Sequence, residues 1–142
     1  MVKVAVMLPA AAEDAGELLA DARALEAAGA AMIGLEGDGP GRSVMLGAIA
    51  VMTERIMLRL SETDPEVTLR RLSGGRVVVG LPEGETWVSI PAPPDREAWA
   101  AMLRDHESSG VTGVVMRWDP RLIDLLRNPE PDDRSDLLMS TG

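Results

Sequence analysis

The sequence predicts an α/β protein built from parallel β/α units. Short apolar runs alternate along the chain with longer segments of helical periodicity. The runs are continuously apolar rather than alternating, which is typical of a parallel sheet covered on both faces or of a closed barrel. Strands that alternate with helices favour parallel pairing through right-handed crossovers. The resulting fold class is a truncated TIM-barrel-like domain of about six strands and five to six helices.

The first half of the chain contains the longest regular segments. Strands are predicted at residues 2–8, 31–36, 56–60 and 76–81, and helices at 13–28, 43–53 and 65–73. Gly29 suits the end of the first helix, and Ser43 or Arg42 lies near the cap of the second. Asp64 is predicted to cap the third helix, with Pro65 at its first helical position. Gly74 would close that helix and turn the chain into the next strand.

The second half continues the same alternation. Strands are predicted at 86–90 and 111–117, and helices at 95–108 and 119–126. Asp95 is the expected cap of the longer helix, and Gly110 its end. We expect one barrel-related domain over residues 1–127, followed by a polar, proline-broken tail over residues 128–142.

Composition excludes several classes of function. The net charge of -9 argues against nucleic-acid binding, because phosphates demand a basic surface. The chain has no cysteine and one histidine, which excludes thiol catalysis, thiolate metal sites and multi-histidine metal sites. No apolar run is long enough to span a bilayer, and the apolar start is too short for a signal peptide. We therefore expect a cytoplasmic protein with neither nucleic acid nor membrane as partner.

Two segments in the first half carry a family resemblance. The string AIAVMTERI at residues 48–56 is followed by LSGGRVVVG at residues 72–80. Together they resemble the A-x-A-x-x-T-x-R-I and L-S-x-G-R segments of the bacterial luciferase-like family of flavin-dependent monooxygenases. The segments LEAAG at 25–29 and ESSGVTGV at 107–114 are also similar to that family. The resemblance covers most of residues 1–80 and, more weakly, 86–127.

The resemblance implies a (β/α)8 barrel that uses FMN or a deazaflavin to oxidise a small organic substrate. Members are about twice as long as this chain. The first four β/α units and about two late ones would be present, whereas the middle of the barrel would be missing. Either six strands close into a smaller barrel, or a half-open sheet is covered by a second copy. Open edges are a liability, so a homodimer is expected.

Candidate site residues lie where the predicted strands end, since active sites in such folds occupy that edge. If flavin binding is retained, Arg42, Arg117 and Trp118 are expected to hold the cofactor. Most of the other side chains there are acidic and would repel a flavin phosphate, namely Glu36, Asp38, Glu62, Glu83, Glu85 and Asp119. Two alternatives therefore stay open: a non-catalytic binding or assembly module, and a hydrolase assisted by a divalent cation on the rim carboxylates.

Overall fold

The strands form one curved parallel sheet in the computed structural model, which describes residues 1–9, 14–38 and 40–127. The sheet has six strands in the order β4-β3-β2-β1-β6-β5. The strands are β1 (Lys3–Pro9), β2 (Met32–Glu36), β3 (Met57–Leu60), β4 (Val77–Val79), β5 (Trp87–Ser89) and β6 (Gly113–Arg117). The helices are α1 (Ala15–Ala28), α2 (Pro40–Met52), α3 (Glu66–Ser73), α4 (Arg96–Ser108) and α5 (Arg121–Arg127). The predicted α/β class with parallel pairing is confirmed.

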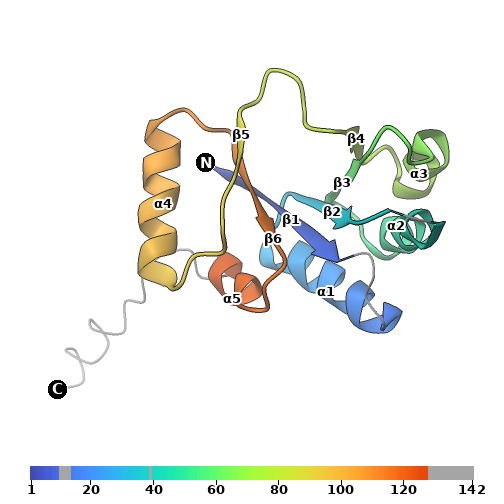
Figure 1. Cartoon of the computed structure of the whole chain (residues 1–142), viewed down its shortest axis with the longest axis horizontal. Helices are drawn as coiled ribbons and strands as arrows, with labels where there is room; N and C mark the ends of the chain where they lie inside the picture. Colours follow the sequence, from blue (N-terminus) through green and yellow to red (C-terminus); the bar gives the residue numbers. More distant parts are fainter. Residues whose placement is uncertain (10–13, 39, 128–142) are drawn as a thin grey trace.

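The sheet is an open half-barrel. In Figure 1 the helices lie outside the curved sheet, in an arc from α4 through α5, α1 and α2 to α3. Strands β4 and β5 form the two edges, and residues 80–86 cross the gap between them without a helix. The six strands do not close into a smaller barrel, so that alternative is wrong. The first strand pairs with the last, and this is the cyclic order of a barrel opened between β4 and β5.

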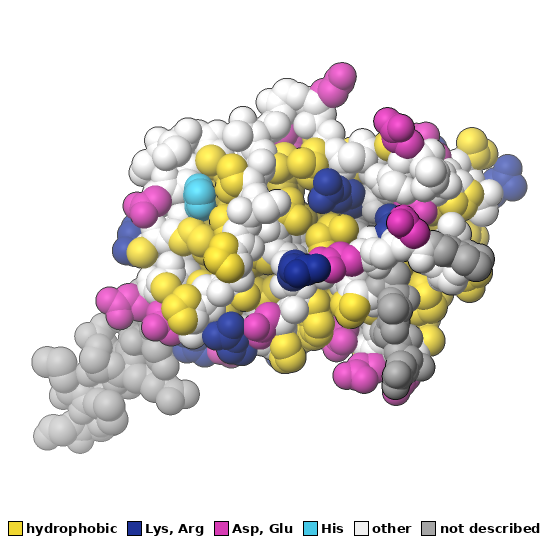
Figure 2. Space-filling model, in the orientation of Figure 1, with side chains coloured by type: hydrophobic (Ala, Val, Ile, Leu, Met, Phe, Trp, Pro, Cys, Tyr) yellow, Lys and Arg dark blue, Asp and Glu magenta, His cyan; other side chains and the backbone are white. Residues whose placement is uncertain are grey.

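The two faces of the sheet differ in what covers them. On the convex face, strand residues such as Val6, Ile33 and Leu58 are fully buried in the main core beneath the helices. The concave face carries a smaller apolar cluster, made of Ala5, Met32 and Val115 with the partly buried Met7, Met57, Val78, Leu81 and Trp87. Figure 2 shows hydrophobic side chains gathered in the middle of the molecule over the central strands. In the described part of the chain, the helices pack on the convex face of the sheet, and no helix covers the concave face.

Two glycines on the concave face make room for large neighbours. A Cβ on Gly113 of β6 would lie 2.4 Å from a ring carbon of Trp87, the residue paired with it on β5. A Cβ on Gly34 of β2 would lie 2.6 Å from Sδ of Met7, its partner on β1. Both distances are far shorter than a carbon contact allows. The absence of a side chain at these positions lets Trp87 and Met7 lie across the neighbouring strands.

Some predicted helix boundaries agree with the structure. The Asp95 carboxylate accepts a hydrogen bond from the backbone N–H of Ala98 at 2.8 Å, so the predicted cap of α4 is confirmed. Gly29 ends α1 with φ of 100°, and Gly74 ends α3 with φ of 67°. Glycine is favoured at both positions because a positive φ strains residues that carry a Cβ.

Other boundaries were predicted wrongly. Helix α2 begins at Pro40 rather than near Ser43, because proline suits a first turn in which its missing N–H would be unpaired anyway. Helix α3 begins one residue later than predicted, and Asp64 does not cap it, because the Asp64 carboxylate is bound elsewhere. Strands β4, β5 and β6 are all shorter than predicted. The polar tail predicted over residues 128–142 lies outside the described residues. No helix in the described part of the chain is long and apolar enough to cross a membrane.

The two segments that carry the family resemblance meet at the amino edge of the sheet. The Nε of Arg76, just before β4, donates to the Ser73 carbonyl at 2.7 Å. Nη1 donates to Thr53 Oγ1 at 3.1 Å and to the Ile56 carbonyl at 2.6 Å. Nη2 donates to the carbonyls of Ala50 and Thr53, both at 2.9 Å. All five N–H groups of the guanidinium are therefore used, and they tie β4 to the end of α2.

A carboxylate from α1 stabilises the same edge. Glu26 Oε2 accepts hydrogen bonds from the backbone N–H groups of Glu54, Arg55 and Ile56 at 2.9, 2.7 and 2.9 Å. Burial by itself raises the pKa of Glu26, but the three hydrogen bonds and the charge of Arg55 outweigh it and hold the pKa below its ordinary value. The link between α2 and β3 is thus held by Glu26 from one side and by Arg76 from the other.

Candidate functional site

The carboxyl ends of β1 to β4 surround a cavity of about 400 Å³. The lining residues are Met7, Leu35, Gly37, Asp38, Arg42, Arg59, Leu60, Ser61, Glu62, Val79 and Gly80. Parallel β/α folds bind ligands at this edge, because several loops converge there. The volume lies in the range of small-molecule sites. This cavity is therefore the candidate functional site.

A second cavity, of about 520 Å³, lies at the opposite edge of the sheet, between the start of β1 and α4. Its lining is mainly apolar and includes Val4, Trp99 and Leu103. The indole N–H of Trp99 is buried and has no hydrogen-bond partner among the described residues. Amino edges of such sheets usually contribute to stability rather than to chemistry, so we place the site at the carboxyl edge.

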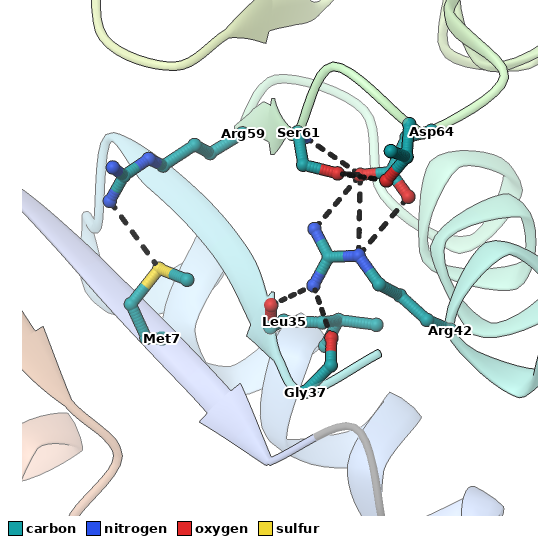
Figure 3. A network of polar contacts seen from close by, with 8 residues as sticks. Met7, Leu35, Gly37, Arg42, Arg59, Ser61 and Asp64 are labelled. Atoms are coloured by element: carbon teal, nitrogen blue, oxygen red, sulfur yellow. Dashed lines mark hydrogen bonds and ion pairs between the residues drawn. The ribbon is translucent and has the colours of Figure 1, made fainter. Parts of the chain in front are cut away.

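One side of the site is held by an ion pair between Arg42 and Asp64 (Figure 3). Nε and Nη2 of Arg42 donate to the Asp64 carboxylate at 3.1 and 2.9 Å. Nη1 donates to the carbonyl oxygens of Leu35 and Gly37 at the end of β2. The carboxylate also accepts bonds from Ser61, from its backbone N–H at 2.8 Å and its hydroxyl at 3.1 Å. The network joins three elements: β2, α2 and the loop after β3.

Asp64 is nearly fully buried and is kept charged by this network. Its side chain is 2 % exposed, and that of Arg42 is 10 % exposed. Burial raises the pKa of Asp64, but the hydrogen bonds from Arg42 and Ser61 and the charge of Arg42 outweigh it, so the pKa lies below its ordinary value. The pair leaves little of the Arg42 guanidinium free for a ligand. We conclude that Arg42 first of all fixes the shape of the cavity.

Arg59 is the other cationic side chain of the cavity. It lies on β3 between Leu58 and Leu60, which are buried in the main core, so its own side chain points to the concave face. In Figure 3 this side chain extends across the sheet toward Met7, away from the Arg42–Asp64 pair. Its one polar contact with the described residues is from Nη1 to the Sδ of Met7, at 3.9 Å. Thioether sulfur is a weak acceptor, so the positive charge of Arg59 is not neutralised there.

Sequence reasoning did not single out Arg59. The available signal was a lone charge within the apolar run of residues 56–60. A charge in the middle of a buried strand indicates either a partner or a function.

Two of the residues predicted to hold cofactor lie at the end of β6. Arg117 forms a bidentate pair with Glu36 of β2, with Nε to Oε1 at 2.9 Å and Nη2 to Oε2 at 3.1 Å. The backbone N–H of Trp118 donates to the Met7 carbonyl at 2.9 Å, and its half-buried side chain packs against the main core. Of the three predicted residues, Arg42 alone lines the cavity. Their role in cofactor binding stays a prediction.

The acidic side chains predicted to lie together at the strand ends are divided between the carboxyl and amino edges of the sheet. Asp38 and Glu62 line the cavity. Glu85, in contrast, lies near the amino edge, because it accepts a bond from Trp87 Nε1 at 3.1 Å and is 3.7 Å from Nζ of Lys3 at the start of β1. Its predicted position on the rim is wrong, since residues 80–86 carry the chain back down the sheet. Among the described residues, no three His, Asp or Glu side chains are grouped as a metal ion would require.

Comparisons with known proteins add no assignment. No profile of a known protein family matches the chain, and no curated protein is significantly similar to it.

The groups that line the cavity define the chemistry available there. They are the paired Arg42, the unneutralised guanidinium of Arg59, the carboxylates of Asp38 and Glu62, the Ser61 hydroxyl and apolar walls such as Leu60 and Val79. His106, the one histidine, lies on α4, which does not line the cavity. General acid or base catalysis near neutral pH would therefore have to use a carboxylate such as Asp38 or Glu62.

Proposed function

We propose that this protein binds a small organic molecule in the cavity at the carboxyl edge of β1 to β4. The observation that carries the proposal is the cavity itself, about 400 Å³ in volume, with one wall fixed by the Arg42–Asp64 pair. A wall that is fixed before the ligand arrives lowers the entropy lost on binding. The function is that of a binding module on a shortened barrel scaffold.

We propose FMN or a deazaflavin as the first ligands to test, because of the resemblance to luciferase-like proteins. Two observations support this ancestry. The strand order is that of a barrel opened between β4 and β5, as expected if consecutive middle units had been lost. The two resembling segments also contact one another through Arg76 and Thr53, so they form one structural unit.

A second candidate is a flavin- or deazaflavin-dependent oxidoreductase. The same ancestry favours it, with Arg42, Arg117 and Trp118 holding the cofactor. Against it, both arginines are already paired with carboxylates, and the Trp118 ring packs against the main core. We therefore place binding before catalysis.

The test is a titration of the purified protein with FMN, riboflavin and a deazaflavin, followed by fluorescence. Saturable binding of at least one of them supports the binding module. Oxygen consumption with chemically reduced FMN that is faster than the spontaneous reaction of free reduced FMN with oxygen would then support the oxidoreductase. If the flavin binds in the cavity, Val79→Trp should weaken its binding at least tenfold, because the larger side chain would occupy part of the cavity. If none of the three binds at high micromolar concentration, the flavin proposals fail.

We also propose that the protein forms a homodimer. The open strand edges favour association, but β4 and β5 have 3 residues each and offer few backbone groups. A larger apolar surface, here called the α2 surface, consists of Val44, Val51, Met52 and Leu72. Val44 and Val51 are 71 % and 65 % exposed, and their spacing of two helical turns places them on one face of α2.

The α2 surface is suited to a second copy of itself. Arg42 is the one charged residue of α2, so two copies of the helix could meet about a two-fold axis without opposing like charges. Leu72 of α3 extends the surface, because its Cδ1 lies 3.5 Å from where a Cβ on Gly47 would be.

Light scattering tests the dimer. Val51→Glu should convert it to a monomer of 15.1 kDa. Val67→Glu is the matched control, because Val67 is 76 % exposed but lies about 140° around α3 from Leu72. A wild-type protein that scatters as a monomer at all concentrations would refute the dimer.

A further inference from the structure

Arg59 places a positive charge on the concave face of the sheet. Leu58 and Leu60 are 0 % and 1 % exposed on the convex side of β3, which fixes the direction of the intervening side chain. The guanidinium of Arg59 is thereby held over the sheet, next to the methionine sulfur at 3.9 Å. A half-buried cation that has lost part of its hydration and contacts no carboxylate among the described residues is unfavourable by itself.

The other arginines of this edge are already neutralised. Arg42 is paired with Asp64, and Arg117 is paired with Glu36. Arg59 is consequently the cation at the cavity that an incoming anion can bind without breaking an existing ion pair. A planar guanidinium binds phosphate or carboxylate through two parallel hydrogen bonds, and these bonds are stronger than those between neutral groups.

The remaining polar groups of the cavity define the rest of the ligand. Asp38 and Glu62 are exposed residues at its rim, and no contact between them and Arg59 is present. Their carboxylates accept hydrogen bonds and repel free anions, so they favour a ligand with hydroxyl or amino donors at its other end. A bare inorganic anion would thus bind more weakly than an anion attached to a polar organic body.

We propose that Arg59 recognises the anionic group, phosphate or carboxylate, of a small polar organic ligand bound in the carboxyl-edge cavity. The inference rests on the proposed binding function of that cavity and adds the ligand class and the recognising residue. It also gives Gly34 a role, because the absence of a Cβ there lets Met7 lie beneath the Arg59 side chain.

The test compares FMN with riboflavin, which lacks the phosphate, on the wild type, on Arg59→Met and on the control Arg71→Met. Methionine keeps much of the length of the side chain on a face that already holds Met57, and Arg71 is an exposed arginine on α3 outside the cavity. In the wild type and the control, FMN should bind about ten- to a hundredfold more tightly than riboflavin. In Arg59→Met the two affinities should become equal, through weaker FMN binding with riboflavin unchanged. An FMN preference that survives in Arg59→Met overturns the inference and leaves the binding function intact.

A second measurement decides the inference if neither flavin binds. The melting temperature is recorded with inorganic phosphate, with acetate and with sodium chloride at equal ionic strength. An anion site at Arg59 is supported if phosphate or acetate raises the melting temperature above its value in sodium chloride for the wild type and Arg71→Met but not for Arg59→Met. Phosphate and acetate then distinguish the two kinds of anion. No rise, or the same rise in all three proteins, refutes the site.

Discussion

Replacement of Arg76 by methionine should destabilise the fold more than any other single change of a surface-accessible charge. The guanidinium donates to four carbonyl oxygens and one hydroxyl, at distances between 2.6 and 3.1 Å. Methionine preserves much of the length and volume of the side chain and removes all five donors. The acceptors of Ala50 and Ile56 belong to residues that are 1 % and 2 % exposed, so water would replace the lost bonds poorly.

The expected magnitude follows from those two buried carbonyls. A buried acceptor left without a donor costs about 1–3 kcal/mol. The other three acceptors belong to Thr53 and Ser73, which are also buried, at 4 % and 5 % exposed. We therefore expect the free energy of unfolding to fall by at least about 3–4 kcal/mol, a large part of the stability of a domain this size. Arg76→Lys retains three donors and should lose about half as much.

The assay is equilibrium unfolding in urea, followed by far-ultraviolet circular dichroism and by the fluorescence of the three tryptophans, of which Trp99 is 1 % exposed. A shift of the midpoint at constant slope reports the change in stability. Arg71→Met is the control, because it removes the same charge from an exposed position of α3 and should stay within about 0.5 kcal/mol of the wild type. If Arg76→Met lies within about 1 kcal/mol of this control, the five hydrogen bonds do not stabilise the fold as argued.

Three further predictions concern carboxylates and glycines. Glu26→Gln should lower stability by about 1 kcal/mol at neutral pH. Because the folded-state pKa of Glu26 is depressed, this difference should begin to shrink below the ordinary value of 4.5 and be lost as pH falls through the lower folded-state pKa, as measured by urea midpoints across pH. Asp64→Asn leaves Arg42 without its counter-charge and should cost about 3 kcal/mol in the same assay, and an unchanged midpoint would contradict the network. Gly113→Ala should displace the ring of Trp87, with a shifted emission spectrum and a loss of about 1–3 kcal/mol, whereas Gly34→Ala meets a flexible methionine and should cost less.

Much of the fold could be predicted because its signals are local. A cap such as Asp95 acts on an N–H three residues away, and a glycine such as Gly29 acts on its own backbone. Parallel pairing follows from strand–helix alternation. Closure could not be predicted in the same way, because it depends on how residues 80–86 span the gap between two edge strands, and no local pattern encodes that distance.

The candidate site was harder to predict because its decisive contacts join distant segments. Asp64 has the residue type and position of a helix cap, and sequence alone gives no reason to prefer Arg42, 22 positions earlier, as its partner. The same limit applies to Arg117 and Glu36, which are separated by 81 positions. Arg59 was missed for another reason: a lone charge in the apolar run of residues 56–60 indicates a partner or a function, but it does not show that the cation lacks an anion.

The opening of the barrel gives a physical reason for the different roles of the amino and carboxyl edges of the sheet. A closed barrel holds every strand from both sides, whereas β4 and β5 here have one strand neighbour each. Side-chain and backbone hydrogen bonds at the amino edge compensate for the missing neighbours. Arg76 holds the start of β4, and the Thr86 carbonyl, just before β5, accepts a hydrogen bond from the Thr112 N–H at 2.8 Å. At the carboxyl edge of β4, the backbone N–H of Gly80 bonds to the Leu60 carbonyl, and the cavity begins directly beyond it. Amide exchange should therefore be slow before β4 and faster after it, and a ligand in the cavity should slow exchange after β4 most, because that end of the edge strand has the fewest other constraints.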